Sequence, residues 1–148
     1  TRNRGTENMA LGLKSFGATT TPEPGNPVAN LNLQLSQAIA DLEVTQNEFE
    51  RVLQEYAAAV NQEEAAYNSE MLNIIRLAQM ESKKEPTDKV KSVMCEKACE
   101  RERLNRRVLE FEKEALHSRI KVLSTKITAF QTKAKLLQGE MDLSGRYT

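Results

Sequence analysis

The chain has 148 residues, of which 39% are hydrophobic and 5% aromatic, and it contains no tryptophan. A chain of this length suits one domain, but this composition does not supply the apolar volume of a thick globular core. The 21 basic and 21 acidic residues balance, so no net field draws the whole molecule to nucleic acid or an anionic membrane. Because the sequence also lacks an apolar run of about 18 residues, we expect a soluble protein without a transmembrane segment.

Residues 1–29 predict an extended, non-helical arm. Pro22, Pro24 and Pro27 remove backbone donors and bias the residues before them toward extended geometry. Such a segment has too little apolar surface to fold alone in water. Its apolar anchors, spaced for a strip that lies in a groove of another protein, are Met9, Leu11, Leu13 and Phe16. We therefore expect the arm to bind a neighbouring subunit.

Residues 30–84 predict a first long helix. Its apolar residues recur at alternating spacings of four and three, which is typical of a coiled-coil seam. This part of the seam consists of Leu35, Ile39, Leu42, Phe49, Leu53 and Tyr56. A polar interruption follows, and a turn near Asn61–Glu64 would instead give a three-helix bundle. Alanines on both sides of the interruption favour one continuous helix.

Residues 85–88 predict the tip of a hairpin, because Glu85 precedes Pro86 and so leaves helical geometry, while Thr87 or Asp88 can cap the next helix. A second helix is expected over residues 89–138, ending at Gly139, with an irregular tail at 139–148. Its early seam reads Val90, Met94, Leu104, Val108, Phe111 and Ala115. After a shift of one residue, which changes the winding of a coil, the late seam reads Leu116, Ile120, Leu123, Ile127 and Phe130.

Folding the second helix back on the first at Pro86 brings matching residues together. The expected apolar pairs are Leu35 with Leu137, Leu42 with Phe130, Phe49 with Leu123, and Tyr56 with Leu116. The expected charge match places Glu63, Glu64 and Glu70 opposite Arg101, Arg103, Arg106 and Arg107. The sequence therefore predicts an all-α fold, a long antiparallel two-helix coiled-coil hairpin with an extended arm, and the three-helix bundle is the alternative.

No residue pattern indicates catalysis, a cofactor or a metal site. His117 is the only histidine and is not accompanied by a nucleophile or a carboxylate pair. Cys95 and Cys99 lie four residues apart on a helix, where they are poorly oriented for a disulfide and too few to bind zinc. We expect a non-enzymatic protein with free thiols in a reducing, intracellular compartment, with an organelle or a virion as alternative locations.

Three functions compete. The leading hypothesis is a structural or assembly subunit that binds other subunits, or a second copy of itself, through coiled-coil faces and the arm. Apolar residues beside the seam support a further helical partner: Val44, Val52, Leu72, Ile75, Leu109, Val122 and Leu136. The second hypothesis is a helical-hairpin adaptor or stalk that regulates a motor, secretion or trafficking machine.

The third hypothesis is a binder of a membrane surface or nucleic acid. It would use a basic hairpin tip formed by Lys83, Lys84, Lys89 and Lys91. Aromatic residues on which bases could stack are missing from this stretch, which makes nucleic acid the weaker target.

Overall fold

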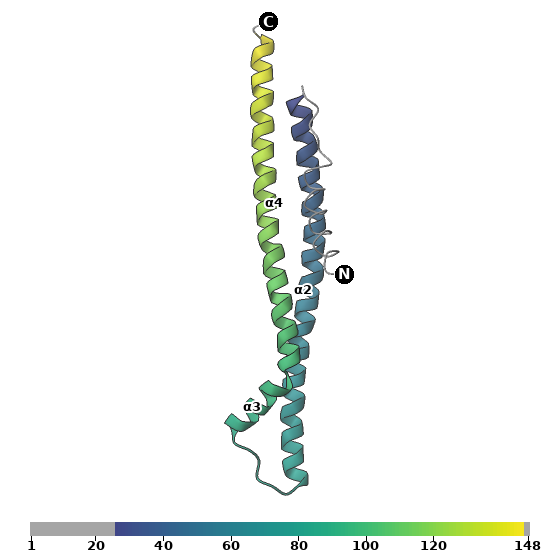
Figure 1. The fold of residues 1–148 in the computed structure, drawn as a ribbon, viewed down its shortest axis with the longest axis vertical. Helices are drawn as coiled ribbons and strands as arrows, with labels where there is room; N and C mark the ends of the chain where they lie inside the picture. The colour runs from purple at the N-terminus through teal and green to yellow at the C-terminus, as the bar shows by residue number, and fades with distance from the viewer. Residues whose placement is uncertain (1–25, 147–148) are drawn as a thin grey trace, which may run out of the picture. The chain divides into compact units, whose positions relative to one another are not determined.

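The computed structural model describes residues 26–146 of the chain (Figure 1). These residues form three α-helices, α2 (Pro27–Met80), α3 (Asp88–Ala98) and α4 (Glu100–Arg146), and no strand. The prediction of an all-α fold is confirmed for this part of the chain. The expected arm residues Met9, Leu11, Leu13 and Phe16 lie outside the described residues.

Helix α2 begins at Pro27, three residues before the expected start at 30. Proline suits the first helical position because its missing N–H would have no partner within the helix. The side chain of Asn26 accepts a hydrogen bond from the backbone N–H of Ala29 at 3.2 Å, so Asn26 caps the helix. The last proline of the expected arm therefore starts the helix.

The polar interruption does not break α2, which is helical through residues 61–64. The helix ends at Met80, four residues before the expected end at 84. Ser82 adopts a φ of 53°, and the N–H of Lys83 donates to the carbonyl of Ala78 at 3.0 Å, which satisfies a carbonyl of the last turn. The chain thus leaves α2 earlier than the proline alone indicated.

Helix α3 starts as the sequence predicted. Thr87 has extended backbone geometry, and its hydroxyl accepts a hydrogen bond from the N–H of Val90 at 3.4 Å. The expected second helix over 89–138 is nevertheless divided, because Cys99 departs from helical geometry (φ −102°, ψ 16°) between α3 and α4. The helix direction changes at this residue (Figure 1). Neither glycine nor proline marks the break in the sequence.

Helix α4 continues past Gly139 to Arg146, so the expected end and the irregular tail at 139–148 do not hold for residues 139–146. A β-carbon at Gly139 would meet nothing within 4 Å, so the glycine lies at an open helical position. There a glycine costs about 1 kcal/mol relative to alanine, which does not suffice to end a long helix.

The chain forms two compact units. One contains the start of α2 up to Val44 together with α4 from Lys121 onward. The other, Thr45–Ile120, contains the rest of α2, all of α3 and the start of α4. The contacts between helices described below lie within this second unit.

The covered face of α2 is only partly the one that the apolar pattern predicted. Through Ala59 its buried positions recur every seven residues, and Ile74 and Ala78 are buried farther along the helix. The repeating positions are Leu31, Ala38, Thr45, Val52 and Ala59. Between them, Leu35, Leu42, Phe49 and Tyr56 are half-buried, as the predicted seam requires. Ile39 and Leu53 are 42% and 38% exposed, however, and the buried residues lie one position before them. After Leu31, the most covered positions carry alanine, threonine or valine, so a pattern of large apolar residues does not mark them.

On α4 the predicted late seam lies on a covered face. Leu116 and Leu123 are buried, and Ile120, Ile127 and Phe130 are half-buried. The predicted early seam is exposed instead, at Val90, Met94, Leu104, Val108, Phe111 and Ala115. At the start of the helix, Arg103, Arg106, Leu109 and Lys113 are half-buried, together with Glu102, Glu110 and Glu112. The apparent shift of the seam by one residue is therefore a change from one face of the helix to another.

The pairing of α2 with α4 also differs in register. Phe49 contacts the ring of His117, with centroids 5.8 Å apart, where Leu123 was expected. Lys113 places its ammonium 4.4 Å from the centre of the Tyr56 ring, where Leu116 was expected. Each of these α2 residues contacts a residue that lies earlier along α4 than the expected partner. This shift agrees with the end of α2 before the predicted residue, which moves the point of chain reversal away from Pro86. The pairs Leu35 with Leu137 and Leu42 with Phe130 stay predictions.

Candidate functional site

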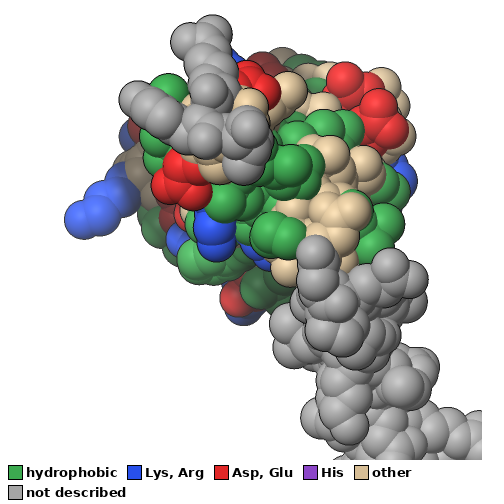
Figure 2. Space-filling model, turned by 90° about the horizontal axis from the view of Figure 1, so that it is seen from above, with side chains coloured by type: hydrophobic (Ala, Val, Ile, Leu, Met, Phe, Trp, Pro, Cys, Tyr) green, Lys and Arg blue, Asp and Glu red, His purple; other side chains and the backbone are tan. Residues whose placement is uncertain are grey.

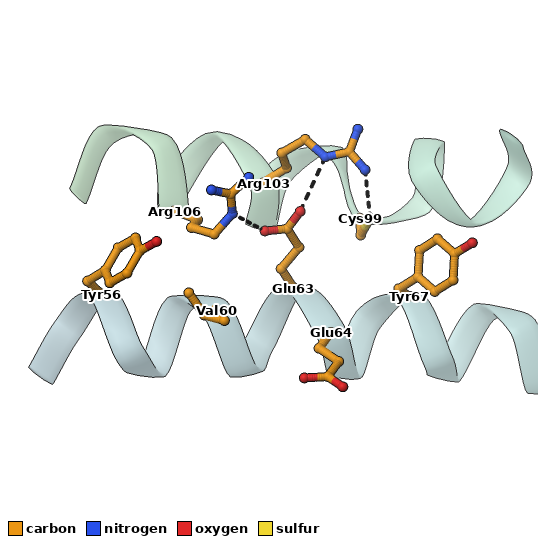
Figure 3. Close-up of a pocket in the computed structure, with 8 residues that line it drawn as sticks. All are labelled: Tyr56, Val60, Glu63, Glu64, Tyr67, Cys99, Arg103 and Arg106. Atoms are coloured by element: carbon orange, nitrogen blue, oxygen red, sulfur yellow. Dashed lines mark hydrogen bonds and ion pairs between the residues drawn. The ribbon is translucent and has the colours of Figure 1, made fainter. Parts of the chain in front are cut away.

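An ionic cluster joins α2 to α4 at the polar interruption of the seam. Glu63 of α2 accepts a hydrogen bond from Nε of Arg106 and another, at 3.3 Å, from Nε of Arg103 (Figure 3). Arg106 also donates to Glu110 at 3.4 Å. The side chains of Glu63, Arg103 and Arg106 are only 18%, 31% and 24% exposed, respectively. The expected match between acidic and basic stretches is confirmed for these residues.

The electrostatics of the cluster keep all three groups charged. Partial burial opposes ionisation of Glu63, but hydrogen bonds from Arg106 and Arg103, together with their charges, outweigh it and lower the pKa of the carboxyl. The hydrogen bond to Glu63 in turn raises the pKa of each arginine. The carboxylate held ionised in this way joins α2 to α4 through two charge-assisted hydrogen bonds.

A hollow of about 410 Å³ adjoins the cluster. It is lined by Tyr56, Val60, Glu63, Glu64, Tyr67, Cys99, Arg103 and Arg106. Figure 3 shows Glu63 between the two arginines, whereas Glu64 points away from them. At one end of the hollow the Tyr67 hydroxyl hydrogen-bonds to the Ser92 hydroxyl at 3.1 Å, which ties α2 to α3. These groups cross-link three helices and do not place a nucleophile beside a base.

The two cysteines are free thiols with no exposed surface. Burial raises the pKa of the Cys95 thiol, and the charges of Glu70 and Cys99 raise it further. The Cys99 thiol donates to the carbonyl of Glu96 at 3.5 Å, and its sulfur lies 3.8 Å from Nη2 of Arg103. The Cys99 thiol is thus packed beside the ionic cluster at the break between α3 and α4, and Cys95 is buried one turn earlier, in α3.

The native thiols should resist modification. We expect Ellman's reagent at about pH 8 to react with the folded chain at least about 100-fold more slowly than with the chain in denaturant, because both thiols are buried and the pKa of Cys95 is also raised. A stopped-flow or spectrophotometric time course measures both rates, and Cys99→Ser separates the two thiols. Rapid, stoichiometric reaction of the folded chain would contradict the burial.

Helix α4 carries a second apolar face, which we call the outer stripe. It consists of Leu104, Val108, Phe111 and Ala115, spaced four, three and four residues apart. Leu104, Val108 and Phe111 are 63%, 56% and 72% exposed, and Ala115 is exposed as well. At 100° per residue, the stripe lies on the side of the helix opposite Leu109, Lys113 and Leu116.

Exposed apolar side chains are also visible in the surface view, where they lie among acidic and basic ones (Figure 2). Isolated exposed apolar residues are normal on protein surfaces, but four at coiled-coil spacing on one helix are not isolated. The heptad pattern in the sequence identifies the residues of the outer stripe, but it predicts them on the inner seam, which is the wrong face of the helix. The one-residue shift between Ala115 and Leu116 was the signal that two faces were involved.

Comparison with protein-family models, with curated proteins and with solved structures gives no significant match to this chain. The chemistry of its own residues is therefore the guide to its function.

The predicted basic tip is partly neutralised by nearby acids. Lys83 lies 3.0 Å from Glu81, and Lys91 lies 3.3 Å from Glu85 and 3.2 Å from Asp88. Hydrogen bonds to Asp88 and then to Glu85 raise the pKa of Lys91. Lys84 and Lys89 are exposed. The four lysines therefore do not act as one block of positive charge.

Two further kinds of site are missing from the part of the chain that the structure describes. Within residues 26–146, no three or more His, Cys, Asp or Glu side chains are grouped so that they could hold a metal ion. In the same range, no helix combines the length and the apolar character needed to cross a bilayer.

Proposed function

We propose that the chain is a non-enzymatic assembly subunit that binds other protein subunits through helical faces. The observation that carries this proposal is the outer stripe, an exposed apolar face with the spacing by which one α-helix packs against another. A face of this kind is an unfavourable surface in water unless a second helix covers it. The covered faces of α2 and α4 do not include the residues of the outer stripe, so the stripe is available to a partner.

We also propose that α2 and α4 form an antiparallel coiled-coil hairpin rather than part of a three-helix bundle. In the second unit, residues farther along α2 meet residues nearer the start of α4: Phe49 meets His117, Tyr56 meets Lys113, and Glu63 meets Arg103 and Arg106. This order is that of an antiparallel pair. The unbroken course of α2 through residues 61–64 also supports the hairpin.

The adaptor and the basic-tip hypotheses have less support. Both depend on the segment between α2 and α3, where Glu81, Glu85 and Asp88 form ion pairs with Lys83 and Lys91. Such local pairs reduce the attraction for an anionic surface. The two free, buried thiols fit a reducing, intracellular compartment, which belongs to the same proposal.

Affinity recovery from the native source tests the function. The tagged full chain is compared with a Phe111→Glu variant, with a chain lacking residues 1–25, and with Leu33→Glu, and co-purifying proteins are identified by mass spectrometry. Leu33 is a control because it is 50% exposed on α2, outside the stripe. We expect a defined set of proteins that Phe111→Glu loses and Leu33→Glu retains. Equal recovery by all forms, or recovery of nothing, would contradict the proposal.

A further inference from the structure

The outer stripe has properties that define its occupant. Its four residues occupy the core positions of nearly two heptads, and such a pattern is complementary to another α-helix. Its side chains alternate in size along the helix axis, from Leu104 and Val108 to the large Phe111 and the small Ala115. The occupant must therefore be a helix that is small where the stripe is large.

We propose that this occupant is a second copy of the chain, whose α4 lies antiparallel along the outer stripe. This inference rests on the proposed function and names its partner. In this pairing Leu104 faces the partner's Ala115, and Val108 faces the partner's Phe111. Two-fold symmetry repeats both contacts, so each large side chain meets a smaller one. All four apolar residues of each stripe are covered by those of the other.

The charges beside the stripe favour the same arrangement. Arg107 and Glu114 flank it on one side, and Asn105 and Glu112 flank it on the other. In the antiparallel pairing, Arg107 lies opposite the partner's Glu114, and Asn105 lies opposite the partner's Glu112. Each contact occurs twice across the symmetry axis. The pairing thus joins opposite charges on one side of the stripe and a donor to an acceptor on the other.

Neighbouring arrangements fit less well. Sliding the two helices to the next antiparallel register places Glu112 opposite the partner's Glu112 and Glu114 opposite the partner's Glu114, so like charges meet. A parallel pairing brings Arg107 to the partner's Glu112, but it sets Phe111 against the partner's Phe111 beside a layer of two alanines. Size and charge together therefore select the antiparallel register.

The interface is short, so the dimer should be weak. Four residues from each helix form its core, which is far from the extent of an obligate interface. We expect a dissociation constant on the order of 10 μM and a concentration-dependent monomer–dimer equilibrium. Because the stripe is exposed in the single chain, substitutions in it should leave the melting temperature of the monomer nearly unchanged.

Sedimentation velocity of the purified full chain over a concentration series tests the dimer. We expect Phe111→Glu to raise the dissociation constant at least about 100-fold, because it buries a carboxylate against the partner's Val108. Leu33→Glu is the control for an exposed leucine outside the stripe, and it should leave the constant unchanged. Circular dichroism of each variant confirms that the helices are retained.

A charge exchange tests the register. Arg107→Glu alone and Glu114→Arg alone should each weaken self-association about 10-fold, since each puts like charges opposite each other. An equimolar mixture of the two variants should associate nearly as well as the unaltered chain, because both contacts are then Glu with Arg. In a parallel dimer the mixture would keep two like-charged contacts and would not recover.

Other outcomes overturn the inference and separate it from the proposed function. The inference is wrong if the chain stays monomeric up to about 1 mM or if the dimer tolerates Phe111→Glu. It is also wrong if mixing the two charge variants does not restore association. If the chain is monomeric but Phe111→Glu still loses its co-purifying proteins, the second copy is wrong and the assembly function stands. If deletion of residues 1–25, which leaves the cap of α2 in place, creates the dimer, the arm occupies the stripe instead.

Discussion

Replacing Val52 with aspartate should lower the free energy of unfolding by about 3 kcal/mol or more. Val52 has no exposed surface and is one of the three largest fully buried side chains among the described residues. The substitution buries a carboxylate away from water at a position built for an apolar side chain. It also removes the apolar contacts of the valine. Urea unfolding followed by circular dichroism measures the change in midpoint and, with the slope, in free energy.

Two aspartate variants on the same helix serve as controls for Val52→Asp. Val44 is 65% exposed, and Val44→Asp should cost less than about 1 kcal/mol. Leu53 belongs to the seam that the apolar pattern predicts, yet it is 38% exposed, so Leu53→Asp should cost clearly less than Val52→Asp. A larger effect at Leu53 than at Val52 would show that the predicted seam, and not the observed face, is the one that packs.

The second large effect is expected at the ionic cluster. Glu63→Lys should destabilise the fold by about 2 kcal/mol, because it removes the carboxylate that pairs with both Arg103 and Arg106 and sets three positive groups together in a half-covered position. The expected loss of stability is smaller than for a fully buried ion pair, since solvent still reaches these side chains. Thermal or urea unfolding of the variant measures it.

Glu64→Lys provides the matched control for the cluster. Glu64 is the next residue along α2, is exposed and points away from the arginines (Figure 3). Its reversal should change stability by less than about 0.5 kcal/mol. Combining Glu63→Lys with Arg106→Glu should recover part of the loss by recreating an opposite-charge pair. If Glu63→Lys and Glu64→Lys lower the free energy of unfolding by the same amount, the change in net charge, and not the ionic cluster, explains the effect.

The cluster also predicts a pH dependence. The pKa of Glu63 is lowered from its ordinary value of 4.5 in the folded chain, so the carboxylate stabilises the fold above that value. This contribution should be lost as the pH falls through the lowered pKa. The stability difference between the unaltered chain and Glu63→Gln should therefore be full at neutral pH and shrink in acid. A difference that grows on acidification would contradict the assignment.

Several features of the fold could be predicted from the sequence because they depend on local chemistry. The helical segments, the cap at Thr87 and the continuous course of α2 through the polar interruption follow from backbone propensities and capping. The pairing of Glu63 with Arg103 and Arg106 followed from matching charge along two antiparallel segments. A charged patch within an apolar seam has few acceptable partners, so even a rough register identifies them.

The break at Cys99 and the register of the helices could not be predicted in this way. Cys99 is neither a glycine nor a proline, so its residue type does not mark the departure from helical geometry that the structure shows there. The register depends on where α2 stops, which is decided by the turn at Ser82. Proline at 86 marks the connection between the helices but does not mark its centre.

The sequence by itself determined that this protein is helical and that its helices bear apolar residues at coiled-coil spacing. Only the tertiary structure decided which of those residues are covered. Val52 is buried while Leu53 is partly exposed, and Leu116 is buried while Phe111 is exposed. The physical reason is that heptad spacing shows which residues share a face of a helix, whereas a helix with two apolar faces can cover either one. The choice is made by the packing of the other helices of the chain.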